Sequence, residues 1–97
     1  MGAVAAGLLE TRGLADALEA LDAMLKAAGV RLCLMKRVGS GVVAIVVKGE
    51  VAAVEAAVEA GARKVLAEGG TLLCSYVIAN PHPALRKYLI GEAKIIE

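Results

Sequence analysis

The order of apolar and polar residues along the chain first predicts a strand and then a helix. Residues 3–9 (AVAAGLL) form a continuous apolar run with the length of a buried strand, which the polar ETRG that follows is expected to end. From Leu14 onward, apolar residues recur at helical spacing and charged residues occupy the other faces. The apolar face of this helix is expected to consist of Leu14, Leu18, Leu21, Leu25 and Ala28.

A hairpin is predicted next. Residues 30–38 (VRLCLMKRV) alternate in the manner of a strand, and residues 42–47 (VVAIVV) are a β-branched run. The two runs are joined by Gly39, Ser40 and Gly41. Two strand patterns separated by three residues that include glycine are typical of a β-hairpin.

The second half of the chain predicts another helix. Apolar residues at helical spacing run from Val51 to Val65, and Gly69 and Gly70 are expected to end this helix. Gly61 lies inside the pattern, where glycine costs about 1 kcal/mol relative to alanine. We therefore expect Gly61 to let a neighbouring element, such as the sheet, approach closely.

The remaining residues predict a fourth strand and a short final helix. Residues 71–78 (TLLCSYVI) have the composition of a strand, and Pro83 suits the first turn of a helix. The complete order is strand, helix, strand, strand, helix, strand. This is the α+β, ferredoxin-like βαββαβ plan: a four-stranded antiparallel sheet with two helices on one face, plus a short C-terminal helix. Residues 1–97 are expected to form a single domain with a core at about 4–89 and a loosely held tail at 90–97.

Composition indicates that the chain assembles with copies of itself. Of its 97 residues, 59% are hydrophobic, and the mean hydropathy is +0.70. A chain of this length buries only about 60–65% of its unfolded surface when it folds alone. Because contiguous exposed apolar surface usually marks an interface, the surplus is expected to lie between subunits.

Charge and segment lengths disfavour two classes of partner. The 11 basic and 10 acidic residues give a net charge of +1, without the basic excess of a nucleic-acid binder. No apolar run reaches the ~18–20 residues of a membrane span, and the first residues lack the basic region of a signal peptide. We expect neither a nucleic-acid nor a membrane partner, and a cytoplasmic location.

Candidate catalytic residues are few. Gly39, Ser40 and Gly41 lie between two strands, whereas a phosphate-binding loop lies between a strand and a helix. Ser40 would need an adjacent base to act as a nucleophile. His82, the only histidine, lies between two prolines, which favours a helix N-cap or turn contact over a general base. We expect no enzymatic activity and no cofactor.

The cysteines do not predict a metal site. Cys33 and Cys74 lie in separate apolar segments, too far apart in sequence for a Cys-x-x-Cys pair, although their strands leave open that they are neighbours. In a cytosolic chain two such cysteines are expected to be buried thiols rather than a disulfide. The two cysteines and the single histidine of the chain are too few to supply the four ligands of a structural zinc site.

Several segments together resemble the shell proteins of bacterial microcompartments, in the single-domain class that forms hexamers. They are GLLETRGLADALEALDAMLKAAGV (7–30), KRVGSGVVAIVVKGEVAAVEAAVEAGA (36–62) and VIANPHPAL (77–85). The resemblance implies a homohexameric tile that packs with other shell proteins around enclosed enzymes in the cytoplasm. It implies that Gly39, Ser40 and Gly41 line a central pore for small polar metabolites, and that Lys26, Pro81 and His82 lie at the tile edge.

Two positions depart from the pattern of that family. Asn80 stands where arginine is common, and asparagine cannot supply a guanidinium fork, so weaker edge contacts are expected. Lys36 stands where an acidic residue is common, and together with Arg37 it would place positive charge on the strands that lead to the pore. The two residues either attract anions or simply form a solvated strand end.

Two other classes of function stay open on this fold plan. One is an oligomeric ligand-binding regulatory module, and the other is a small enzyme, which the lack of a catalytic set disfavours. The number of subunits in solution separates both from a hexameric shell protein.

Overall fold

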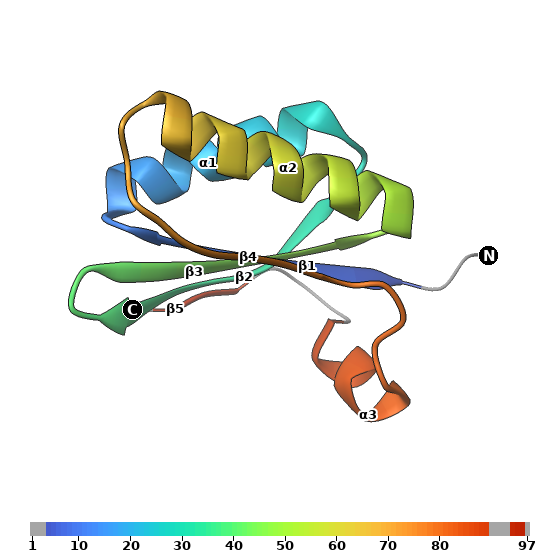
Figure 1. Cartoon of the computed structure of the whole chain (residues 1–97). Coiled ribbons are helices and arrows are strands. Elements are labelled where there is room, and N and C mark those ends of the chain that lie inside the picture. Colours follow the sequence, from blue (N-terminus) through green and yellow to red (C-terminus); the bar gives the residue numbers. More distant parts are fainter. Residues whose placement is uncertain (1–3, 90–93, 97) are drawn as a thin grey trace.

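The structure is a computed structural model that describes residues 4–89 and 94–96. Figure 1 shows helices α1 and α2 side by side on one face of a sheet, and the short α3 beyond the other face at one end. The elements are β1 (Ala5–Arg12), α1 (Leu14–Ala27), β2 (Arg31–Gly39), β3 (Val42–Gly49), α2 (Val51–Ala67), β4 (Leu72–Ile78), α3 (Pro83–Arg86), the 3₁₀ helix η1 (Lys87–Leu89) and β5 (Lys94–Ile96).

The sheet confirms the predicted fold. Its strand order is β4-β1-β3-β2-β5, and the four long strands pair antiparallel. This is the order that two split βαβ units produce when both helices cover the same face. No helix among the described residues is long and apolar enough to cross a membrane.

A fifth strand corrects the prediction of a loose tail. Lys94, Ile95 and Ile96 pair in parallel with Leu34, Met35 and Lys36 of β2. Strand β2 would otherwise be an edge strand with unpaired backbone groups, which favour the addition of another strand. The rest of the predicted tail, residues 90–93 and 97, lies outside the described residues.

Strand β1 is longer than its apolar run. It continues through Glu10, Thr11 and Arg12, so the prediction that ETRG ends the strand was wrong. Thr11 is fully buried and its hydroxyl donates to the Gly13 carbonyl at 3.3 Å. The polar residues on either side of Thr11 face away from the core, because alternate residues of a strand point to opposite faces.

Helix α1 buries a different face from the one that the leucines predicted. Its fully buried residues are Ala17, Ala20 and Met24, whereas Leu18 is 51% exposed and Leu25 is 44% exposed. Small residues let the helix lie close to its neighbours, and Met24 fills the space beside Gly61 of α2. A Cβ atom on Gly61 would lie 2.7 Å from Met24 Cγ and 3.0 Å from Leu9 Cδ1. The expected close approach at Gly61 is therefore confirmed, with α1 as well as the sheet.

Helices α1 and α2 cover one face of the sheet, and the other face stays largely uncovered. On the helix face, Leu9, Ile45 and Val47 are fully buried beneath α1 and α2. On the opposite face, here called the open face, apolar side chains stay partly or largely exposed, and Tyr76 is 61% exposed. The open-face residues of β1, β3 and β4, set by the register, include Leu8, Val46, Tyr76 and Ile78. A groove of about 240 Å³ lies between them and the segment that contains α3.

Candidate functional site

The turn between β2 and β3 has an unusual backbone. Gly39, Ser40 and Gly41 have φ angles of 93°, 53° and 79°, and all three residues are exposed. Gly39 pairs with Val42, so the turn has two central residues rather than the three-residue link that the sequence predicted. Positive φ at both central residues is typical of a type I′ hairpin turn, which matches the twist of the flanking strands.

Two donors from the β1–α1 junction hold this turn. Arg12 Nη1 donates to the Ser40 carbonyl oxygen at 2.8 Å, and the Gly13 amide donates to the Gly41 carbonyl oxygen at 2.6 Å. Sequence reasoning missed Arg12, because the ETRG segment was expected to leave the sheet. The pairing of Arg12 with Val42 is what brings its side chain beside the turn.

Lys36 and Arg37 are both exposed, but they lie on opposite faces of the sheet. Lys36 pairs with Ala44, on the open face, whereas Arg37 pairs with Val43, which is buried on the helix face. Arg37 also lines a hollow of about 310 Å³ together with Gly13, Leu14 and the residues that flank the turn. The two cations therefore flank the turn from different sides.

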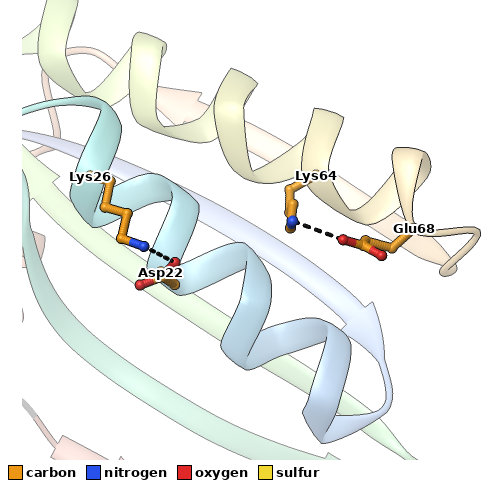
Figure 2. Close-up of polar contacts among 4 residues, drawn as sticks. All are labelled: Asp22, Lys26, Lys64 and Glu68. Carbon is orange, nitrogen blue, oxygen red and sulfur yellow. Dashed lines mark ion pairs between the residues drawn. The ribbon is translucent and has the colours of Figure 1, made fainter.

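Lys26 lies in the last turn of α1, where its ammonium group pairs with the Asp22 carboxylate. Lys26 Nζ is 2.8 Å from Asp22 Oδ2, and the two side chains are 75% and 61% exposed (Figure 2). A cation in the last turn of a helix is also favoured by the helix dipole. The pair holds Lys26 on the surface of the helix.

The segment after β4 is held by a residue that the sequence did not single out. Arg86 Nη2 donates to Asn80 Oδ1 at 2.7 Å, and Arg86 Nε donates to the Pro81 carbonyl at 3.1 Å. Pro81 is buried, and His82 Nδ1 accepts from the Ala84 amide at 3.0 Å, which confirms His82 as the N-cap of α3. Asn80 supplies no guanidinium, but Arg86 brings one to the same turn.

The candidate residues fall at the two ends of the sheet. Arg12 pairs with Val42 beside the β2–β3 turn, whereas the opposite end of β1, at Ala6, pairs with Ile78 and Lys48. Lys26 and Asn80 lie at this second end, because α1 ends where β2 begins and Asn80 follows Ile78. The β2–β3 turn and α3 lie at opposite ends of the molecule in Figure 1.

This separation argues against a catalytic pair of Ser40 and His82. The serine lies at the turn and the histidine at the far end of the sheet, where its Nδ1 caps α3. A nucleophile needs its base within hydrogen-bond reach. Two helix carboxylates pair with cations on the helix surface, Glu59 with Arg63 and Asp22 with Lys26.

A further ion pair lies near the C-terminal end of α2. Lys64 Nζ is 2.8 Å from Glu68 Oε1 (Figure 2). The hydrogen bond and charge of Lys64 lower the pKa of Glu68, and those of Glu68 raise the pKa of Lys64. Exposed pairs of this kind typically contribute little to stability, because solvent screens their charges.

The cysteines lie on strands that are not neighbours. Cys33 is on β2 and Cys74 is on β4, and β1 and β3 separate them, so the possibility that they adjoin was wrong. Burial raises the pKa of Cys33, and the charge of Lys48 offsets part of this effect. Burial first, and then Glu10, raises the pKa of Cys74. In the part of the chain that the structure describes, no cluster of His, Cys, Asp or Glu could hold a metal ion.

Comparisons with known proteins indicate the family of this chain. The BMC domain family matches residues 5–81. The carboxysome shell protein CsoS1A of Hydrogenovibrio crunogenus is 47% identical over 91 residues, which are 94% of this chain and 95% of that protein. The carboxysome shell protein CsoS1 of Parasynechococcus marenigrum is 51% identical over 79 residues, 81% of this chain and 77% of that one.

A solved structure shares the fold. A microcompartment protein from Desulfitobacterium hafniense superposes with a TM-score of 0.78 at 36% identity, over 87% of this chain. This chain spans only 45% of that protein's length. The match over residues 5–81 and the identities near 50% show that the chain belongs to the BMC domain family.

Proposed function

We propose that the protein is a structural, non-catalytic subunit of a bacterial microcompartment shell, located in the cytoplasm. In this proposal six copies form a ring, the turn of Gly39, Ser40 and Gly41 surrounds the six-fold axis, and the rings pack edge to edge with one another and with other shell proteins. Membership of the BMC domain family and the names of its carboxysome relatives support this function.

The observation that carries the proposal is the placement of the two candidate sets at opposite ends of the sheet. A subunit of a closed ring needs one end near the axis and another at the rim. The exposed, positive-φ turn suits the axis, because six backbones must crowd together there and glycines lack Cβ atoms. Lys26, Asn80, Pro81 and His82 lie at the other end and suit the rim, with Arg86 as a further cation there.

Exposed apolar side chains support assembly independently. Helix α1 leaves Leu14, Leu18 and Leu25 between 37% and 51% exposed, and the open face adds Tyr76 at 61%. In a ring, heterologous contacts between copies would cover such surfaces, and the ring closes when six copies complete the rotation. The expected surplus of apolar surface is thus distributed over α1 and the open face.

The ring gives the turn a function that one copy lacks. Six Ser40 hydroxyl groups and the neighbouring backbone donors would line a polar opening without formal charge at its narrowest point. Lys36 would flank this opening on one side of the tile and Arg37 on the other, one of each from every copy. Such a lining favours small anionic or hydroxylated metabolites over apolar gases.

Electron microscopy of the purified protein tests this proposal. We expect class averages with six-fold symmetry and a central hole, and two-dimensional sheets at high protein concentration. Lys26→Asp reverses the charge at the rim, so this variant should still form rings but fewer sheets. Rings whose turns lie at the rim, or particles of another symmetry, would contradict the proposal.

A further inference from the structure

Two carbonyl groups of the turn already accept hydrogen bonds from the β1–α1 junction. The Ser40 carbonyl accepts from Arg12 and the Gly41 carbonyl accepts from the Gly13 amide, at 2.8 Å and 2.6 Å. Carbonyl oxygens that line a pore stabilise cations, as in selectivity filters. Because the Ser40 and Gly41 carbonyl oxygens already accept hydrogen bonds, they attract cations less strongly. The polar group that the turn presents is then the Ser40 hydroxyl group.

The bond from Arg12 also holds a backbone that is otherwise easily deformed. Gly39 and Gly41 flank Ser40, and glycine populates positive and negative φ about equally. Ser40 itself has a φ of 53°, in the left-handed region that non-glycine residues seldom adopt. A Cβ atom on Gly41 would meet only Arg12 Cγ, at 3.8 Å, so packing around the turn is sparse apart from Arg12.

The open face also carries charged side chains near the turn. The register places Arg12 on the open face with Lys36, and Glu10 lies across Ala44 from Lys36. Two cations and one carboxylate therefore lie on this face near the turn. Arg37 is the cation on the helix face.

We propose that Arg12 is the positioning residue of the pore turn and a determinant of its preference for small anions. The inference rests on the proposed ring, in which the turn surrounds the axis. The guanidinium group fixes the Ser40 carbonyl away from the opening, keeps Ser40 in its left-handed conformation, and adds a positive charge beside each of the six turns.

The test combines ion selectivity with amide exchange in the full-length protein. Purified hexamers are placed in a planar bilayer under a KCl gradient, and the reversal potential gives the permeability ratio of chloride to potassium. Hydrogen–deuterium exchange of Gly13 and of residues 39–42 reports how firmly the turn is held. The variants are Arg12→Gln, Arg12→Lys and Lys36→Gln, with Arg63→Gln on α2 as the matched control for loss of an exposed arginine.

We expect Arg12→Gln to lower the chloride preference at least about twofold and to accelerate exchange at the turn, since it loses both the charge and the guanidinium contact. Arg12→Lys should keep most of the preference but exchange faster. Lys36→Gln should lower the preference without changing exchange, and Arg63→Gln should match the wild type in both measurements.

The inference would be overturned if Arg12→Gln hexamers had the same chloride preference and the same amide exchange as the wild type. It would also be overturned if wild-type hexamers conducted ions without preferring chloride. If Arg12→Gln fails to assemble, unchanged exchange in Arg12→Lys overturns the positioning role and faster exchange supports it. If the wild type forms no hexamer, the proposed function fails, and the pore role of Arg12 fails with it. Exchange at Gly13 then shows separately whether Arg12 holds the turn.

Discussion

The two faces of the sheet contain similar apolar residues but leave them in different states. On the helix face, Val47 and Ile45 are fully buried under α1 and α2. On the open face, Val46 is only half-buried, although it is the neighbour of both in the same strand. Burial of the helix face accounts for folding of one copy, since each buried CH₂ group contributes about 0.8 kcal/mol. The open face and the leucines of α1 contribute their area only when another molecule covers them.

Among the changes that test this comparison, we expect Val47→Ala to cause the largest loss of stability. Val47→Ala should lower the free energy of unfolding by about 2–3 kcal/mol, because it removes two buried methyl groups and leaves a cavity. Val46→Ala is the matched control, with the same chemical change one residue away on the open face. It should cost less than about 1 kcal/mol.

Urea unfolding of both variants at equal protein concentration measures the difference, since subunit association also contributes to apparent stability. Equal losses would break the comparison, because they would mean that the open face is as tightly packed as the helix face.

A second change sharpens the account of the helix face. A Cβ atom on Gly7 would lie 2.6 Å from Val58 Cγ2 and 2.8 Å from Val54 Cγ1, both on stiff β-branched side chains of α2. Gly7→Ala should therefore destabilise the protein by about 1–3 kcal/mol through overpacking. In contrast, Gly29 has open space around its Cβ position, and Gly29→Ala should change stability by less than about 1 kcal/mol. Thermal unfolding of the two variants would contradict this account if Gly29→Ala were the more destabilising.

The smallest effect concerns the thiols. The pKa of Cys33 and that of Cys74 are both raised, chiefly by burial, so less of each thiol is ionised at pH 8 than in an unfolded chain. Because the thiolate is the nucleophile, alkylation by iodoacetamide should be slower than for the urea-unfolded protein and should accelerate as the pH rises further. Cys33, which is 9% exposed, should react more slowly than Cys74. Mass spectrometry of the alkylated peptides checks the order, and faster labelling of Cys33 would contradict its burial.

Much of the fold follows from local patterns. The helical spacing from Val51 to Val65, the β-branched run before it and the glycine turn depend on neighbouring residues, and each predicted its element correctly. The buried face of α1 was predicted wrongly because leucines outrank alanines in hydrophobicity. The full burial of Ala17 and Ala20, and the packing of Met24 against Gly61, show that the small residues face inward.

The residues that hold the candidate site were hidden for a different reason. Arg12 is 28 residues from Ser40, and their contact depends on the pairing of β1 with β3. Arg86 meets Asn80 only because the chain turns at Pro81 and begins α3. The opposite faces of Lys36 and Arg37 follow from strand alternation, and their nearness to the turn follows from their place in the sequence just before Gly39. Strand β5 pairs with a strand far from it in sequence, which no local pattern indicates.

The central claim is that six copies form a closed ring in which neighbouring copies cover the exposed apolar side chains of each copy. Native mass spectrometry of the purified full-length chain measures this most directly. The account predicts one dominant species with the mass of six 9.9-kDa chains that persists on dilution. A stable monomer, dimer or trimer as the dominant species would contradict it.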